Sequence, residues 1–288
     1  MCRSPSSPSS GGRSSTSGTD AGSRTRRSAG EWVCRDVTVA PTRGFEMAPD
    51  RPSLVASEDT WTPRPPRDAD PEVLAETFRS MILHPDYPCL GARSVVNRHR
   101  ATVLALPWLG APETAPRLLE GLREFARDTD VDDGFASFVA IFRQPEHSDE
   151  KTFERLLWRQ LQTVADADGT PWSTEVSDDP VDPHFSFSAA GTAYFVVGLH
   201  PDASRVARRA PWPTLVFNLH EQFQNLRADG GYERMRERIR IRDSKVQGYP
   251  NPMVEDFGAA SEARQYSGRA VGPHWRPDAD FGGPGEGQ

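Results

Sequence analysis

Apolar residues recur with helical spacing in several stretches of the chain, and this pattern predicts amphipathic helices. The predicted helices are residues 70–83, 114–126 and 148–165, a shorter helix through Val95 and Val96, and a later one with a narrow apolar stripe at Tyr232, Met235 and Ile239. The first helix is the best delimited. Asp70 suits the N-cap, Pro71 suits the first helical position, and His84 ends the helix because Pro85 follows it. Its predicted buried face is Val73, Leu74, Thr77, Phe78, Met81 and Ile82.

Short apolar runs between these helices predict strands. They are residues 102–106, 135–142, 185–189, 193–199 and 214–217. The run at 135–142 reads FASFVAIF, and so continuous an apolar run predicts a strand buried on both faces. The runs at 185–189 and 193–199 are close enough to form a hairpin. Asn218 with Glu221 three residues later has the pattern of a capping box, and Asp202 is expected to start a short arginine-rich helix.

Helices and strands therefore mix without a strict βαβ period. We expect one α/β or α+β domain over residues 61–276, with a mixed, partly antiparallel sheet flanked by helices. Residues 1–30 contain ten Ser, five Gly and five Arg, and no Leu, Ile, Val, Phe, Trp or Tyr. Residues 1–60 are accordingly expected to be a disordered extension, either a transit-peptide-like segment or a translated region upstream of a start at Met47. Residues 277–288 are expected to form a flexible tail.

Charge and cysteine content exclude several classes of protein. The net charge is −7, and residues 31–288 alone carry 29 basic and 40 acidic residues, a net charge of −11. Such an acidic body argues against a nucleic-acid partner. No run of apolar residues is long enough for a membrane helix, so no membrane partner is expected. Three cysteines cannot form a disulfide framework, and the cytoplasm is the expected compartment.

Two of the seven histidines follow predicted strands. His200 ends the strand at 193–199, and His220 begins the helix after the strand at 214–217. If both strand ends open onto one crevice, the two imidazoles lie where open α/β sheets bind ligands. Imidazole is a good ligand for iron or zinc, and haem iron needs only one. A structural histidine is the alternative for each of them.

Other polar residues gather into candidate sites. Arg205, Arg208 and Arg209 lie within five residues and suit a ligand with two carboxylates; the alternative is a surface helix paired with acids. Glu262 and Arg264 lie in a polar, irregular segment. The arginines that alternate from 234 to 242 are interpreted as a solvated face of ion pairs. Cys89 is interpreted as a buried structural residue, with a thiolate ligand or redox residue as the alternative. No P-loop, GxGxxG, GxSxG, HExxH or CxxC motif is present.

Several longer motifs resemble one family. They are Tyr87-Pro88-Cys89, FSFS (185–188), YFVVGLHP (194–201), SRVARR (204–209), LVFNLHEQFQNLR (215–227), IRIRDSKVQGYPNPM (239–253) and SEARQYSGR (261–269). Over about residues 70–276 the chain is similar to the YqcI/YcgG family. It departs from the family pattern at two points. Tyr87 replaces a Phe, and the Cys of the family's Trp-x-Cys-Pro-Phe element is missing after Trp275.

The resemblance implies a haem-dependent N-oxygenase of a natural-product pathway. It implies N-hydroxylation of a guanidino or amino substrate, with L-arginine converted to Nω-hydroxy-L-arginine in an antibiotic pathway of the D-cycloserine type as the specific expectation. The cofactor would be haem b, with iron bound to His200 first or His220 second. Arg205, Arg208 and Arg209 would hold the propionates, and Glu221, Glu262 and Arg264 the substrate.

An electron donor or peroxide would supply the oxidising chemistry, and a homodimer is one option for the assembly. The alternative function is a haem or small-ligand binding protein without catalysis.

Overall fold

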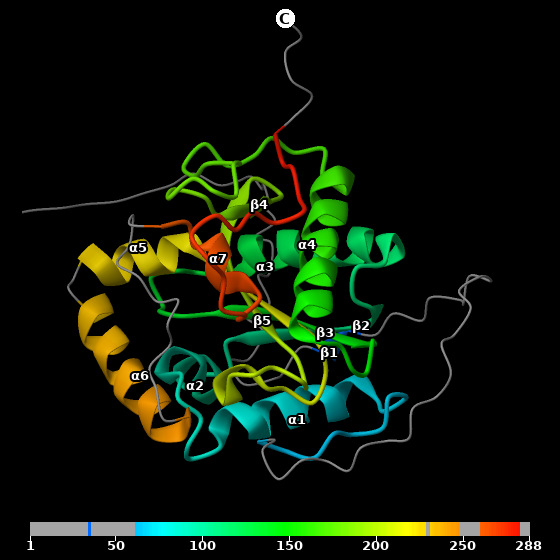
Figure 1. Ribbon diagram of the computed structural model, residues 1–288, viewed down its shortest axis with the longest axis vertical. Helices are drawn as coiled ribbons and strands as arrows, with labels where there is room; N and C mark the ends of the chain where they lie inside the picture. The colour runs from blue at the N-terminus through cyan, green and yellow to red at the C-terminus, as the bar shows by residue number, and fades with distance from the viewer. Residues whose placement is uncertain (1–33, 36–60, 229–230, 248–259, 283–288) are drawn as a thin grey trace, which may run out of the picture.

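The computed structural model describes residues 34–35, 61–228, 231–247 and 260–282, which form a mixed sheet with helices on both faces (Figure 1). The sheet has the strand order β1-β2-β3-β6-β5-β4. Its strands are β1 (Cys34–Arg35), β2 (Ala101–Trp108), β3 (Ser137–Gln144), β4 (Phe187–Ala189), β5 (Thr192–Leu199) and β6 (Thr214–Leu219). The predicted fold, a single α/β domain with a mixed sheet flanked by helices, is confirmed.

The direction of the strands changes in the middle of the sheet. The strands β1, β2 and β3 are parallel, whereas β6 is antiparallel to β3 and β5 is antiparallel to β6. A helix crosses over between β2 and β3, as a parallel pair requires. The β4–β5 pair is the predicted hairpin, and its turn places Ala190 and Gly191 at positive φ.

The helices form a layer on each face of the sheet (Figure 1). They are α1 (Pro71–Leu83), α2 (Leu90–Asn97), α3 (Ala115–Asp128), α4 (Glu150–Ala167), α5 (His220–Ala228), α6 (Gly231–Gln247) and α7 (Ala263–Tyr266), with 3-10 turns η1 (Pro112–Thr114) and η2 (Val206–Arg208). Strand β3 shows the two layers. Phe138 and Phe142 pack into a core with α3 and α4, and Val139 and Ile141 pack into a second core with α1 and α2. As predicted, β3 is therefore buried on both faces. No helix among the described residues is both long and apolar enough to cross a membrane.

Three local predictions are wrong. Val73 is 44% exposed and lies off the buried face of α1. Asn218 belongs to β6 and does not cap α5, because its side chain is engaged by neighbouring strands: it accepts a hydrogen bond from Ser137 Oγ and donates one to the Phe195 carbonyl. In the segment after Asp202 the only helical structure is the short turn η2.

The two expected terminal segments are described only in part. Phe281 is buried and stacks on Phe185, with Trp172 at 5.1 Å between ring centroids, so the expected tail at 277–288 packs on the core at this residue, and residues 283–288 lie outside the described ranges. The expected extension at 1–60 lies outside the described residues except for β1, which pairs with β2.

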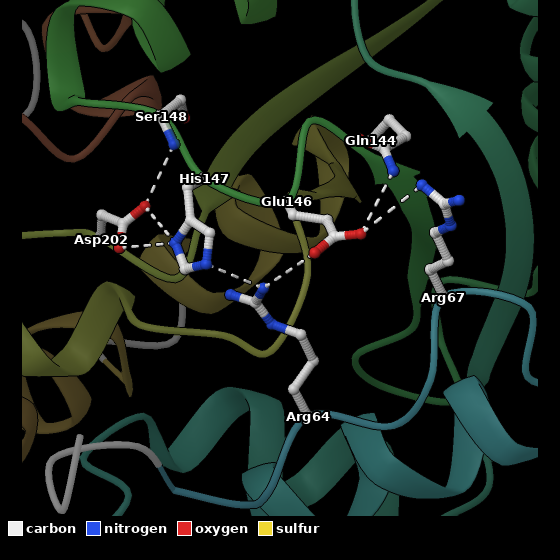
Figure 2. Close-up of polar contacts among 7 residues, drawn as sticks. All are labelled: Arg64, Arg67, Gln144, Glu146, His147, Ser148 and Asp202. Carbon is white, nitrogen blue, oxygen red and sulfur yellow. Dashed lines mark hydrogen bonds and ion pairs between the residues drawn. The ribbon is translucent and has the colours of Figure 1, made fainter. Parts of the chain in front are cut away.

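A polar cluster at the surface ties three loops together (Figure 2). Nδ1 of His147 lies 3.1 Å from an Asp202 oxygen, which also accepts a hydrogen bond from the Ser148 amide. Nε2 of His147 lies 3.2 Å from an Arg64 nitrogen. Because a guanidinium only donates, Nε2 of His147 is the acceptor in this contact, and Nδ1 faces the carboxylate. The cluster joins the loops before α1, before α4 and after β5.

Candidate functional site

A cavity of about 300 Å³ lies between the sheet and the helices α1, α2 and α6. We call it the sheet-face cavity. Its floor is made by the alternate residues of β3, β5 and β6 that point away from α3 and α4, and its walls are mostly apolar. The floor residues are Ser137, Val139, Phe195, Val197, Leu199, Val216 and Asn218, and the helices add, among others, Phe78, Ile82, Val95, Met235 and Ile239. Its size and lining are those of a small-molecule site.

Six charged or thiol-bearing side chains line this cavity. They are Cys89, Arg205, Arg208, Arg240, Glu262 and Arg264. Arg205 is only 6% exposed, and its position beside an apolar floor makes it suited to an anionic group of a ligand. Cys89 is the N-cap of α2, where its sulfur accepts a hydrogen bond from the Ala92 amide. The charges gather on the side of η2, α6 and α7, so a ligand would meet an apolar floor and a polar rim.

Glu262 belongs to a buried chain of hydrogen bonds. One of its oxygens, Oε1, accepts hydrogen bonds from Ser186 Oγ at 2.5 Å and from the Tyr266 hydroxyl at 2.7 Å. Ser186 Oγ also lies 3.0 Å from Nδ1 of His220. Burial, with the nearby Glu262 carboxylate, raises the pKa of Tyr266 well above its ordinary value, which keeps its hydroxyl protonated as a donor.

His200, the first expected iron ligand, does not line the sheet-face cavity, so it could not bind the iron of a haem held there. It follows β5 on the α4 face of the sheet, where its ring stacks on Phe153 with 4.3 Å between centroids. The side chain is 1% exposed, and none of the described residues hydrogen-bonds its Nδ1. Burial lowers the pKa of His200 to about 4, so the ring is neutral near pH 7. His200 is a core residue.

His200 and His220 do not share a crevice. Strands β5 and β6 are antiparallel, and Leu199 pairs with Thr214 while Leu219 pairs with Tyr194. The two strand ends are therefore at opposite ends of the pair, roughly 17 Å apart at five residue steps. The prediction required both strand ends to open onto one crevice, and the antiparallel pairing of β5 with β6 excludes this. His220 lines a separate surface depression, which Glu221 also lines.

The three neighbouring arginines separate in the same way. Arg205 lines the cavity, and so does Arg208. The guanidinium of Arg208, however, donates hydrogen bonds to the carbonyls of Gly198, Tyr266 and Gln265 and thereby fastens α7 to β5. Arg209 donates to the Ala203 carbonyl and does not line the cavity. Of the three arginines expected to hold one anionic ligand, Arg205 and Arg208 line the cavity and Arg209 does not.

The structure thus brings together Arg205, Glu262 and Arg264 but leaves His200, His220, Arg209 and Glu221 outside the cavity. Sequence reasoning missed Ser186 and Arg240, and it gave Cys89 a structural role. Ser186 lies within the FSFS motif and Cys89 within Tyr87-Pro88-Cys89, so the motifs themselves were the available signal. For Arg240 the signal was its position beside Ile239 on the narrow apolar stripe.

Within the described ranges the lining of the cavity holds no histidine, but three other side chains there can ligate haem iron: the thiol of Cys89, the thioether of Met235 and the phenol of Tyr87. Of these, Cys89 is the one that can supply a thiolate. The described residues also hold no group of three or more His, Cys, Asp or Glu that could bind a metal ion by themselves. A haem requires only one such ligand, because the porphyrin supplies most of the others.

Comparisons with known proteins agree with the motifs. The model of the YqcI/YcgG family matches residues 78–277. The uncharacterized protein YcgG of Bacillus subtilis (strain 168) is 26% identical over 176 residues, which are 58% of this chain and 68% of YcgG. The uncharacterized protein YqcI of the same organism is 26% identical over 162 residues, 54% of this chain and 64% of YqcI, so the match spans less than two thirds of that relative. No solved structure matches the chain significantly.

Proposed function

Because the chain belongs to the YqcI/YcgG family, we propose that it is a haem-dependent monooxygenase that hydroxylates a nitrogen of a guanidino or amino compound. L-Arginine, with Nω-hydroxy-L-arginine as product, is the first substrate to test, and an antibiotic pathway in the cytoplasm is the proposed setting. The observation that carries the proposal is the sheet-face cavity, which combines an apolar floor with Cys89 and the buried Arg205.

The residues of the cavity fit haem in a different way from the one expected. Cys89, and neither histidine, is the proposed iron ligand. Its sulfur is held at the N-terminus of α2 by a hydrogen bond from the Ala92 amide, and the positive end of the helix dipole suits an anionic ligand atom there. Arg205 and Arg240 are the proposed partners of the propionates, because both line the cavity and guanidinium groups pair well with carboxylates. Val197 and Val216 would contact the apolar porphyrin face.

The remaining charged groups suit a zwitterionic substrate. Glu262 offers a carboxylate to a guanidinium or ammonium group, and Arg264 offers a cation to a carboxylate. The hydrogen bonds from Ser186 and Tyr266 fix the orientation of Glu262 before a ligand arrives.

When bound, haem iron supplies the activation of oxygen, with an electron donor or peroxide as co-reactant. The protein residues bind and orient the nitrogen to be hydroxylated, and the apolar floor excludes water from it.

An absorption spectrum of the purified protein after addition of haem tests the proposal directly. We expect a Soret band that shifts on binding, and a ferrous–CO band at the long wavelength typical of thiolate ligation. Cys89→Ser keeps a good cap for α2 but loses the thiolate, so it should lose that CO band. His200→Leu, the matched control, should keep it. A protein that binds no haem, or a CO band that survives in Cys89→Ser, would contradict the assignment.

Product analysis separates catalysis from binding. With a reductant or peroxide and a panel of guanidines and amines, the enzyme should yield a product heavier by one oxygen atom. A clear haem spectrum with no oxygenated product from any substrate would favour the alternative, a haem or small-ligand carrier.

A further inference from the structure

The buried chain that ends at Glu262 begins at the surface. His220 lines the depression formed with residues 172–175 and 191–193, and it is 6% exposed. Ser186, in the middle of the chain, is completely buried. Glu262, at the other end, lines the sheet-face cavity. Two contacts, of 3.0 Å from His220 to Ser186 and 2.5 Å from Ser186 to Glu262, therefore join the outer depression to the inner cavity.

The donors of this chain point in one direction. The hydroxyl of Ser186 has a single proton, which it donates to Glu262. The contact between Ser186 and His220 therefore requires a proton on Nδ1 of His220, donated to the serine oxygen. Each donor faces inward, from the surface toward the cavity. The order also excludes a nucleophilic triad, because the serine lies between the acid and the imidazole and has no access to a substrate.

We propose that His220, Ser186 and Glu262 form a proton path that delivers protons from solvent to the sheet-face cavity. A cationic His220 passes its Nδ1 proton to Ser186 Oγ while Ser186 passes its own proton to Glu262. His220 ends as the neutral imidazole, Ser186 is unchanged, and Glu262 becomes a carboxylic acid that can act as a general acid on a bound ligand. This deepens the proposed function, since reductive activation of dioxygen consumes protons.

The surroundings favour such a path. Glu175 and Glu221 line the depression with His220, and their negative charges stabilise a cationic imidazole. At the other end Tyr266 donates to the same oxygen of Glu262 as Ser186 does, which holds the carboxylate in line with the serine. Ser186 and Tyr266 are thus positioning residues, and Glu262 is the group that meets the ligand.

Nitrogen NMR of the His220 imidazole tests the direction of the path without haem or substrate. At a pH above the pKa of its imidazole, His220 should be the neutral tautomer protonated on Nδ1. In the resting protein, before a proton has passed to Glu262, a neutral imidazole protonated on Nε2 instead would reverse the donor to Ser186 and overturn the proposal.

Two variants test the coupling between the ends. Glu262→Gln removes the carboxylate and should move the His220 titration to lower pH. Ser186→Ala should reduce the Nδ1 tautomer of His220, and Ser186→Thr, which restores the hydroxyl, should recover it. Ser188→Ala is the matched control, since Ser188 is a buried serine two residues away whose Oγ instead accepts from the Ser173 amide. An unchanged His220 titration in Glu262→Gln contradicts the path, and this result remains decisive even if Ser186→Ala fails to fold.

The haem-loaded enzyme adds a kinetic test. Ser186→Ala should lower turnover with dioxygen and a reductant at least tenfold and increase the solvent isotope effect, whereas Ser188→Ala should change neither. Unchanged turnover in Ser186→Ala would overturn the path. If the protein binds no haem, the proposed function fails and the imidazole measurements still decide the path.

Discussion

The two faces of the sheet are built from the same strands but differ in what they contain. On the α3 and α4 face, large aromatic side chains fill the core, with Phe138, Phe153 and Trp158 all buried to within 1% exposure. On the α1 and α2 face, neighbouring positions of the strands carry Val139, Val216 and other smaller groups, and the cavity opens above them. Because adjacent strand residues point to opposite faces, one set of strands provides both a solid core and a binding surface.

The α3 and α4 face, which we call the filled face, is packed so closely that two positions on it require glycine. A Cβ at Gly198 would lie 2.8 Å from side-chain atoms of Phe153 and Leu157 and from the Tyr266 carbonyl, and one at Gly121 would lie 2.6 Å from the Phe138 ring. At Gly91, on the cavity side, the nearest such atoms are 3.9 Å away. Stability should therefore depend mainly on the filled face, and ligand binding on the other.

The largest expected effect is that of Phe153→Ala. Phe153 is fully buried and supports the His200 ring, so its removal should leave a void and lower the free energy of unfolding by about 3–5 kcal/mol. The matched change on the other face is Phe195→Ala. Phe195 is partly buried and lines the cavity. It should destabilise clearly less but impair ligand binding more. Urea unfolding measures both, and equal losses of stability would contradict the difference between the faces.

The next effect is a pH dependence due to His200. Its pKa is about 4 in the folded protein, against 6.5 ordinarily, so below pH 6.5 the unfolded chain binds a proton that the folded protein does not. This destabilises the fold progressively as the pH falls from 6.5 to 4, by about 3 kcal/mol in all.

His200→Leu should remove this part of the acid sensitivity. Unfolding free energies at pH 7 and pH 4.5 are the measurement, with the exposed His147→Ala as the control that keeps the sensitivity. The same slope in His200→Leu and wild type would show that His200 is protonated in the fold.

The sequence predicted this architecture well because the filled face leaves a periodic signal. The helices at 70–83 and 148–165 and the strand at 135–142 were recognised from apolar spacing, which burial imposes directly. Asn218 was misassigned because its partners, Ser137 and Phe195, are distant in sequence. Local capping patterns carry no information on such contacts.

The site was harder to predict for the same physical reason. Whether His200 and His220 meet depends on the relative direction of β5 and β6, which no local pattern encodes. Glu262 and Arg264 were found because polar residues in an irregular segment signal a site, and the structure does place both at the cavity. Ser186 is buried and flanked by phenylalanines, so apart from the FSFS motif that contains it, no local pattern distinguished it from an ordinary strand serine.

Arg208→Ala should have the third largest effect on stability, because Arg208 connects the two faces of the sheet. Its guanidinium holds the carbonyls of Gly198 in β5 and Gln265 in α7. Without it these buried carbonyls lose charged donors, and we expect a loss of about 2 kcal/mol together with weaker ligand binding as Glu262 shifts. Arg209→Ala, which removes one bond to the Ala203 carbonyl, is the control and should lose less than half as much. Ligand binding unaltered in Arg208→Ala would show that α7 holds its place without this clamp.

The smallest effect should come from the surface cluster of Figure 2, which belongs to neither face. Asp202→Asn weakens the bond to His147, but both side chains are at least 40% exposed, and water and ions compensate such pairs well. We expect the free energy of unfolding to fall by about 0.5 kcal/mol or less, and by still less as salt is added.

The chain His220–Ser186–Glu262 has similar groups at similar distances, but its middle residue is fully buried. Ser186→Ala should therefore destabilise the protein more than Asp202→Asn and show little salt dependence. Chemical unfolding of the two variants at low and high salt measures this contrast. If Asp202→Asn lowered the free energy of unfolding more than Ser186→Ala, burial would not be what decides how much a polar cluster contributes to stability.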